Sequence, residues 1–406
     1  MSVAPEVAGA ASKARAVGLL VVAEVLAMAL WFTASATLAD LVAETGMAPG
    51  RAALLSSAVA AGFVVGALGI AVTGLADRLD PRRVFAVAGL AAALANALPL
   101  AVPPDGALGV AARAAVGLCL AGVYPVGMKI AVGWGLRDRG LLVGLLVGGL
   151  TLGSAAPHLL AFAGGADWRA TTLAASALAA TGSVLVLFTA LGPHHARAPR
   201  FDPSAASLAW TDRRLRRAFA GYLGHMWELY AMWAWIGAAL LASYALRMDA
   251  AEAAPRAKLT AFAAIAAGAA LCPVAGAFAD RIGKARLTVL AMGASGAAAL
   301  GAAASFGGPP WLFATAVVLW GAAIVPDSAQ FSALVADAAP PERAGSLLTL
   351  QTALGFALTV ATVQAVPFAV EAIGWRATLA ALALGPAAGI AAVLPLARAE
   401  RAARRG

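Results

Sequence analysis

Charged side chains are scarce in this sequence. Asp, Glu, Lys and Arg make up 12% of the 406 residues, whereas 62% are hydrophobic, and the mean hydropathy is +0.85. A soluble domain does not need so apolar a composition, and apolar runs of roughly 20 residues are typical of helices that cross a membrane. The composition therefore predicts an all-α membrane protein.

Cysteine is rare as well, and its two copies, Cys119 and Cys272, fall in different predicted helices. This argues against a disulfide framework and against a thiol metal site. His194 and His195 have no cluster of Cys or carboxylates around them, so no metal site is predicted. The phosphate-binding pattern Gly-x-x-x-x-Gly-Lys-Ser/Thr and any acid–base–nucleophile set are also absent. We therefore expect neither an enzyme nor an ATP-driven pump, and no cofactor.

The formal net charge of +9 comes from 29 Lys and Arg against 20 Asp and Glu. The basic residues are spread over short loops rather than gathered in one patch, which argues against nucleic acid as a partner. Most of them fall in alternate loops, the asymmetry of the positive-inside rule. This predicts that both termini and the central loop are cytosolic. The first residues show no secretory signal pattern.

Twelve apolar stretches are long enough to span a bilayer. A polar, proline- and arginine-containing linker at 193–217 divides them into two six-helix bundles, 1–192 and 218–406. The predicted spans are 17–40, 52–74, 83–102, 107–132, 141–163, 170–192, 218–243, 258–279, 287–305, 311–333, 346–370 and 376–396.

The two bundles repeat each other at a nearly constant offset of half the chain. Four pairs carry the repeat: Glu24-x-x-Ala27-Met28-x-x-Trp31 with Glu228-x-x-Ala231-Met232-x-x-Trp235, Gly74 to Arg78 with Gly276 to Arg281, Trp168-Arg169 with Trp375-Arg376, and Tyr124-Pro125 with Val325-Pro326. A duplicated unit with an even number of helices gives parallel halves related by an axis along the membrane normal. Such halves are typical of transporters.

Three sequence patterns together resemble those of the major facilitator superfamily. They are the loop from Gly74 through Asp77 to Arg83, its weaker copy from Gly276 to Arg286, and Arg113-x-x-x-Gly117 in the fourth helix. The resemblance covers essentially the whole chain, although Asp80-Pro81 departs from the usual glycine and basic residue of the loop. Within the family, the chain is nearest to bacterial permeases grouped with nitrate, nitrite and cyanate porters.

The resemblance implies a secondary transporter that moves a small solute by alternating access, with proton coupling, as a monomer in the lipid bilayer of a bacterial inner membrane. Nitrate porters carry an arginine in helices 2 and 8, and spans 52–74 and 258–279 have none. This counts against nitrate itself. Two alternatives remain open: a small-anion porter similar to the nitrate and cyanate porters, and a non-transporting membrane receptor on the same fold.

The signature loops predict a conformational latch. A carboxylate at a helix end can face the N-terminus of a helix in the other half, and arginines can bridge to carboxylates. The alternative is that the basic residues of these loops only set the orientation of the chain in the membrane, by the positive-inside rule. The predicted latch residues are Gly74, Asp77, Arg78, Arg82, Asp280 and Arg281.

The two repeated glutamates are the leading candidates for proton or solute binding. Ionisable groups inside a membrane are costly and point to function by default, and burial disfavours the charged carboxylate, which suits proton coupling. By helical spacing, Glu24 shares a face with Trp31, and Glu228 shares one with His225 and Trp235. A fixed structural partner is the alternative. The nearby Trp227, Tyr230 and Trp233 either stack on a solute or anchor the helix.

Helices 4 and 10 supply the remaining candidates. Arg113 can grip an anionic group or pair with a carboxylate, with Tyr124 on its face. Lys129 and its repeat mate Gln330 are further candidates, although Lys129 also suits snorkelling. Asp327 can pair with Lys129 or bind protons. In helix 5 the glycine spacing of 144, 148 and 153 predicts close helix packing.

Overall fold

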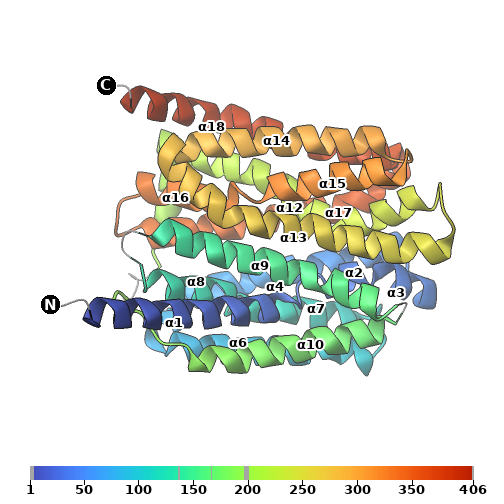
Figure 1. Cartoon of the computed structure of the whole chain (residues 1–406), viewed down its shortest axis with the longest axis horizontal. Helices are drawn as coiled ribbons and strands as arrows, with labels where there is room; N and C mark the ends of the chain where they lie inside the picture. Colours follow the sequence, from blue (N-terminus) through green and yellow to red (C-terminus); the bar gives the residue numbers. More distant parts are fainter. Residues whose placement is uncertain (1–3, 136–137, 166, 196–200, 405–406) are drawn as a thin grey trace.

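The computed structural model describes residues 4–135, 138–165, 167–195 and 201–404. All of the secondary structure in these ranges is helical. The middle of the predicted linker, residues 196–200, lies outside the described residues, as do Leu136 and Arg137. In Figure 1 the long helices run side by side, with the N-terminal half in one layer, the C-terminal half in the other, and both termini at the same end of the molecule.

Broken helices dominate the N-terminal half. Its elements are α1 (Ala4–Met28), α2 (Thr33–Ala36), α3 (Leu38–Thr45), α4 (Pro49–Thr73), α5 (Leu75–Arg78), α6 (Pro81–Ala97), η1 (Leu98–Leu100), α7 (Ala107–Leu120), α8 (Tyr124–Val132), α9 (Arg139–Ala163), α10 (Trp168–Leu185) and η2 (Val186–Phe188).

Longer continuous helices make up the C-terminal half. Its elements are η3 (Pro203–Ala205), α11 (Ala206–Thr211), α12 (Arg213–Tyr244), α13 (Ala250–Ile282), α14 (Lys284–Ser305), α15 (Pro310–Ile324), α16 (Ser328–Ala338), α17 (Ala344–Leu382) and α18 (Leu384–Ala403). The predicted linker is thus partly helical, and α12 begins at Arg213 rather than at 218.

Nine helical segments among the described residues are long and apolar enough to cross a membrane. The last, Ala344–Ala403, contains two crossings, because Gly374 at φ 76° turns the chain in its middle. The segment of α1 to α3 and helix α12 stand outside the nine. With these three additions the helices match the twelve predicted spans.

Aspartate caps start several of the long helices. At the start of α6, the Asp80 side chain accepts a hydrogen bond from the Arg82 amide. Asp167, Asp212 and Asp249 accept from first-turn amides of α10, α12 and α13 in the same way. Pro81 follows Asp80 at the first helical position, where its missing N–H costs nothing. The unusual Asp80-Pro81 of the signature loop is therefore a local helix-start signal.

Three of the predicted helices are interrupted near the middle of their spans. The first breaks between Met28 and Thr33, the fourth between Leu120 and Tyr124, and the tenth between Ile324 and Ser328. Pro125 and Pro326 account for the last two, because proline lacks the N–H that would continue the helix. The break in the first helix has no proline. Its repeat mate α12 is continuous.

The halves meet most extensively between α9 and α13, which adjoin at the middle of Figure 1. A Cβ added to Gly148 would lie 2.9 Å from the Ala269 carbonyl oxygen, and one added to Gly144 would lie 3.1 Å from that of Cys272. The glycine spacing therefore serves close packing between the halves, as predicted. Helices α4 and α17 form the second large contact.

Candidate functional site

Glu24 is completely buried in α1, at 0% exposure. Among the described residues neither carboxylate oxygen has a hydrogen-bond partner. A Cβ on Gly127 of α8 would lie 2.7 Å from Oε2, and one on Gly149 of α9 would lie 3.6 Å from Cγ of the glutamate. The two glycines therefore make room for this carboxyl group, which points into the N-terminal half.

Glu228, the repeat copy, is equally buried but fully hydrogen-bonded. Its Oε2 accepts from the Ser295 hydroxyl at 2.6 Å, and its Oε1 accepts from the Trp320 indole N–H at 2.7 Å. Both donors are neutral and belong to α14 and α15 of the same half. The sequence repeat thus places two glutamates at matching positions, while neighbouring helices give them different surroundings.

The ring of His225 in α12 contacts two residues at the break in the tenth helix. Its Nδ1 lies 3.1 Å from Asp327 Oδ1, and its Nε2 lies 2.8 Å from the Ser328 hydroxyl. His225 and Asp327 are almost completely buried, and Gln330 is buried one turn further along α16. His225 is one helical turn from Glu228, so the C-terminal half contains a compact group of titratable side chains.

Lys129 pairs with Asp77 and Asp327 lies against His225, so the predicted pairing of Asp327 with Lys129 is wrong. The ammonium group of Lys129 also donates to the Ala76 carbonyl at 2.9 Å. The signature loop therefore closes onto α8 of its own half.

The other predicted latch residues make contacts in one half or across the two halves. Arg82 pairs with Asp80 at 2.7 Å and donates to the Thr189 carbonyl at 3.1 Å, both in the N-terminal half. Gly74 has φ +62° and ends α4, next to Arg78 of the short α5. In the second copy of the loop, a Cβ on Gly140 would lie 3.9 Å from Asp280 Oδ2. Asp280 therefore lies beside the first turn of α9 in the other half.

The last turn of α13, which contains Asp280 and Arg281, is also tied to the C-terminal end of the chain. Arg404 donates to the Arg281 carbonyl at 2.7 Å, and Glu400 accepts from the Ala285 amide at 3.0 Å. A cation thus lies at the end of α13 and an anion at the start of α14, the favourable sign for each helix dipole.

Arg113 binds backbone carbonyls at the break in the first helix. Its guanidinium donates to the Leu30 carbonyl at 3.2 Å, to the Trp31 carbonyl at 2.6 Å and to Asn96 Oδ1 at 2.7 Å. These carbonyls follow the end of α1, where a positive charge is favourable. Sequence reasoning missed Asn96, which carries no pattern that marks it.

Six aromatic side chains meet between the halves, and we call them the central aromatic cluster. Trp31 and Tyr230 have ring centroids 5.6 Å apart, and Phe63 and Phe356 are 4.5 Å apart. The complete cluster is Trp31, Phe32 and Phe63 from the N-terminal half with Tyr230, Trp233 and Phe356 from the C-terminal half. Trp235, by contrast, donates to the Val363 carbonyl at 2.9 Å within its own half.

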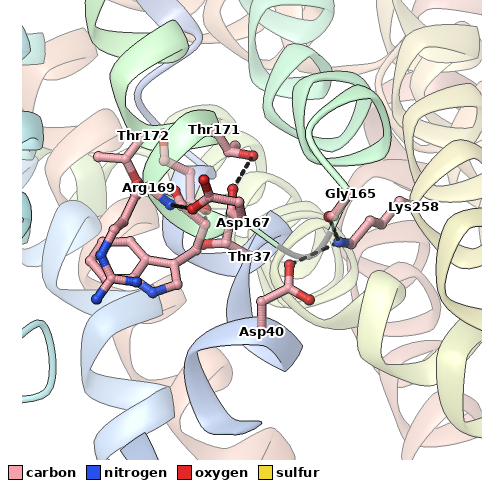
Figure 2. A network of polar contacts seen from close by, with 10 residues as sticks. Thr37, Asp40, Gly165, Asp167, Arg169, Thr171, Thr172 and Lys258 are labelled. Carbon is pink, nitrogen blue, oxygen red and sulfur yellow. Dashed lines mark hydrogen bonds and ion pairs between the residues drawn. The ribbon is translucent and has the colours of Figure 1, made fainter. Parts of the chain in front are cut away.

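Polar contacts join the halves at the end opposite the termini. Figure 2 shows the Lys258 ammonium group between Asp40 and Gly165; it lies 2.8 Å from Asp40 Oδ2 and 2.6 Å from the Gly165 carbonyl. A second polar contact between the halves is the hydrogen bond that the Gln364 amide donates to the Ser57 hydroxyl at 2.7 Å. Sequence reasoning treated Lys258 only as a loop charge and missed this contact.

Glu44 anchors the neighbouring loop. It accepts from both terminal nitrogens of Arg169 at 2.6 and 2.8 Å and from the Trp168 indole at 2.8 Å. These hydrogen bonds, first that of Arg169, hold the pKa of Glu44 at about 2. Arg169 also lies 4.4 Å over the Trp168 ring.

The sequence profile of the Major Facilitator Superfamily matches residues 20–363, so the chain belongs to this family of membrane transporters. Among solved structures it is similar to the nucleoside transporter NupG, with 15% identity, a TM-score of 0.70, and coverage of 93% of this chain and 98% of that one. It is also similar to the xylose transporter XylE from E. coli, with 12% identity, a TM-score of 0.71, and coverage of 95% and 97%. No curated protein matches the sequence significantly.

At these identities the solved structures establish the fold alone. Together with the family match, they identify a multi-pass secondary transporter rather than an enzyme, and its partner is a small-molecule solute. The closer likeness to nitrate and cyanate permeases stays a prediction.

Proposed function

We propose that this protein couples the movement of a small solute to protons and that Glu24 carries the proton. The observation behind the proposal is the Glu24 carboxyl group, fully buried with neither oxygen hydrogen-bonded within the described chain. An ionised carboxylate in such a place costs several kcal/mol, whereas the neutral acid costs much less. Glu24 therefore binds a proton in this conformation and releases it when movement brings water or a donor.

Glu228 is the second proton-binding group of the proposal. Its hydrogen bonds from Ser295 and Trp320 suit an ionised carboxylate, and His225 and Asp327 lie one turn away. Transport in this scheme follows alternating access: the halves 1–192 and 218–406 rock about the central aromatic cluster as a monomer. The charge asymmetry of the loops supports a bacterial inner membrane with both termini cytosolic.

The test is proton movement in proteoliposomes that contain a pH-sensitive dye. The solutes offered first are uridine and D-xylose, because the similar structures are a nucleoside and a xylose transporter. Nitrate, cyanate, small carboxylates, amino acids and organic cations complete the panel. We expect a solute-dependent pH change in the wild type.

Two substitutions decide the role of the glutamates. Glu24→Gln is expected to abolish the pH change, and Glu228→Gln to abolish driven accumulation. The matched control is Glu44→Gln, an exposed glutamate outside the spans. Each variant is first shown to unfold cooperatively, so that loss of function is not loss of fold. A wild-type pH change in Glu24→Gln would refute the proton site.

A further inference from the structure

The first five residues of α12 include four arginines: Arg213, Arg214, Arg216 and Arg217. The first three are exposed and the last is half-buried. None of the four forms an ion pair with any described residue. The start of a helix carries partial positive charge, so cations are unfavourable there. The four guanidinium groups therefore repel one another and the helix dipole, unless an anion from outside the chain compensates them.

Two other helix starts that carry basic residues have a carboxylate partner. At the start of α6, Arg82 pairs with Asp80 at 2.7 Å, and at the start of α14, Lys284 pairs with Asp337 at 2.6 Å. At the start of α12, by contrast, Asp212 accepts from two backbone amides of the helix and pairs with no arginine. The positive charge of α12 is thus left uncompensated within the described residues.

An exposed indole lies beside these arginines. Trp210 of α11 is 55% exposed, and its carbonyl accepts from the Arg216 guanidinium at 2.9 Å. Its neighbours Ala205 and Ala209 are buried in an apolar cluster with Leu215 of α12. Helix α11 is therefore fixed against the C-terminal half, and its packing leaves the Trp210 ring uncovered.

The indole and the arginines lie at the border of an apolar span, because the predicted seventh span begins directly after Arg217. A Cβ on Gly224 would lie 2.5 Å from the Gly385 carbonyl oxygen, and one on Gly221 would meet Val393, so α12 and α18 run antiparallel. The start of α12 thus lies beside the end of α18, at the end of the molecule that holds both termini (Figure 1). Tryptophan is enriched at the level of the lipid headgroups.

We propose that Trp210 and the four arginines, which we call the α11–α12 basic surface, bind the headgroup of an anionic phospholipid. Guanidinium groups bind phosphate oxygens through paired hydrogen bonds, and clusters of basic residues next to a membrane span attract anionic lipids. The indole packs against the glycerol region of the same lipid. Orientation of the chain by loop charge alone needs neither an exposed indole nor an uncompensated helix start.

The whole surface belongs to the C-terminal half, so the bound lipid moves with that half and does not bridge the two. The proposal is independent of proton coupling and of the identity of the solute.

The experiment measures lipid retention by the full chain in detergent. Delipidated protein is titrated with phosphatidylglycerol, or with phosphatidylcholine as the neutral comparison, and the retained lipid is counted by native mass spectrometry. We expect the wild type to retain phosphatidylglycerol in preference, and added salt to weaken its binding. Arg213→Gln combined with Arg214→Gln is expected to raise the half-saturating lipid concentration about fivefold for each arginine removed.

The matched control combines Arg15→Gln with Arg83→Gln. Both arginines are exposed and lie at the same end of the molecule in the N-terminal half, where Thr189 joins the segments next to them. We expect this variant to bind phosphatidylglycerol as the wild type does. Each variant is first shown to unfold at the wild-type midpoint, so that lost binding is not lost fold.

The indole is tested by Trp210→Ser, which is expected to weaken phosphatidylglycerol binding, whereas Trp311→Ser, at a tryptophan that is 69% exposed in α15, leaves it unchanged. Equal retention of the two lipids by the wild type overturns the proposal. So do equal losses in the two double variants, or in the two tryptophan variants. Inorganic phosphate that binds as tightly as the lipid would assign the surface to a soluble anion and overturn it too.

Discussion

Asp40 and Lys258 form an ion pair across the two halves, 2.8 Å apart and each with a side chain only 12% exposed. Lys258 also binds the Gly165 carbonyl. The ammonium group of this α13 residue therefore contacts both α3 and the loop between α9 and α10 (Figure 2). The junction on this side is therefore closed by a partly buried charge pair, and the hydrogen bond of Gln364 with Ser57 also joins the halves.

Neutralising this pair should open the side opposite the termini. Lys258→Met removes about 1 kcal/mol of attraction between the halves, which shifts their equilibrium about fivefold. The readout is labelling of Ser57→Cys by a membrane-impermeant maleimide, with Cys119 and Cys272 replaced by alanine. Lys284→Met is the control, because it breaks a pair with Asp337 inside one half. Equal labelling in both variants would contradict a latch.

Arg113→Met should destabilise the protein by about 3 kcal/mol. The substitution leaves the carbonyls of Leu30 and Trp31 and the Asn96 side chain without their charged donor inside the membrane. Denaturant unfolding in detergent measures the loss, and Arg113→Lys should recover part of it. The control is Arg376→Met, an exposed arginine that binds the Phe306 carbonyl. If Arg113 instead gripped an anionic solute, Arg113→Met would change solute affinity with no change in stability.

Gly148→Ala and Gly293→Ala should have opposite effects. The new methyl group at 148 meets the Ala269 carbonyl at 2.9 Å, whereas the one at 293 finds nothing within 4 Å. Alanine favours the helix by up to about 1 kcal/mol at the open position, but overpacking between α9 and α13 costs about 1–3 kcal/mol. Thermal unfolding should show a gain for Gly293→Ala and a loss for Gly148→Ala. A gain in both would mean that α9 and α13 are not tightly packed.

Stability should depend on the ionisation of Glu44 only at acid pH. Its pKa in the folded protein, about 2, is below the ordinary value of 4.5. The stabilisation is therefore complete above pH 4.5 and is lost as the pH falls towards 2. The measurement is the difference in unfolding midpoint between wild type and Glu44→Gln, which should shrink over that window. Arg169→Met should remove most of the difference at every pH; a difference that persists would assign it to Trp168.

The spans and the two-fold repeat were predictable because they depend on local composition. Apolar runs mark the helices, and the polar linker marks the division between the halves. The start of α6 was also readable, since Asp80 and Pro81 form a local capping signal. The glycine spacing of α9 correctly indicated close packing, because small residues allow helix backbones to approach.

The surroundings of the candidate residues were not predictable, because they come from distant parts of the chain. Glu24 and Glu228 share a sequence pattern, yet only Glu228 receives donors from Ser295 and Trp320. The carbonyls in the break before Thr33 accept hydrogen bonds from Arg113, which lies more than 80 residues later in the chain. Spacing along one helix shows which side chains share a face, but not what covers that face.

The first helix stops at Met28, whereas its repeat mate α12 continues to Tyr244. The first helices of the two bundles are therefore mechanically unlike, because only that of the N-terminal bundle is broken. Backbone hydrogen bonds in the break run from Trp31 to Met28 and from Thr33 to Leu30, a spacing of three residues, so we expect bending to concentrate at residues 29–32. Trp31 and Phe32 lie in this segment, so such bending would move the N-terminal side of the central aromatic cluster relative to Tyr230 and Trp233.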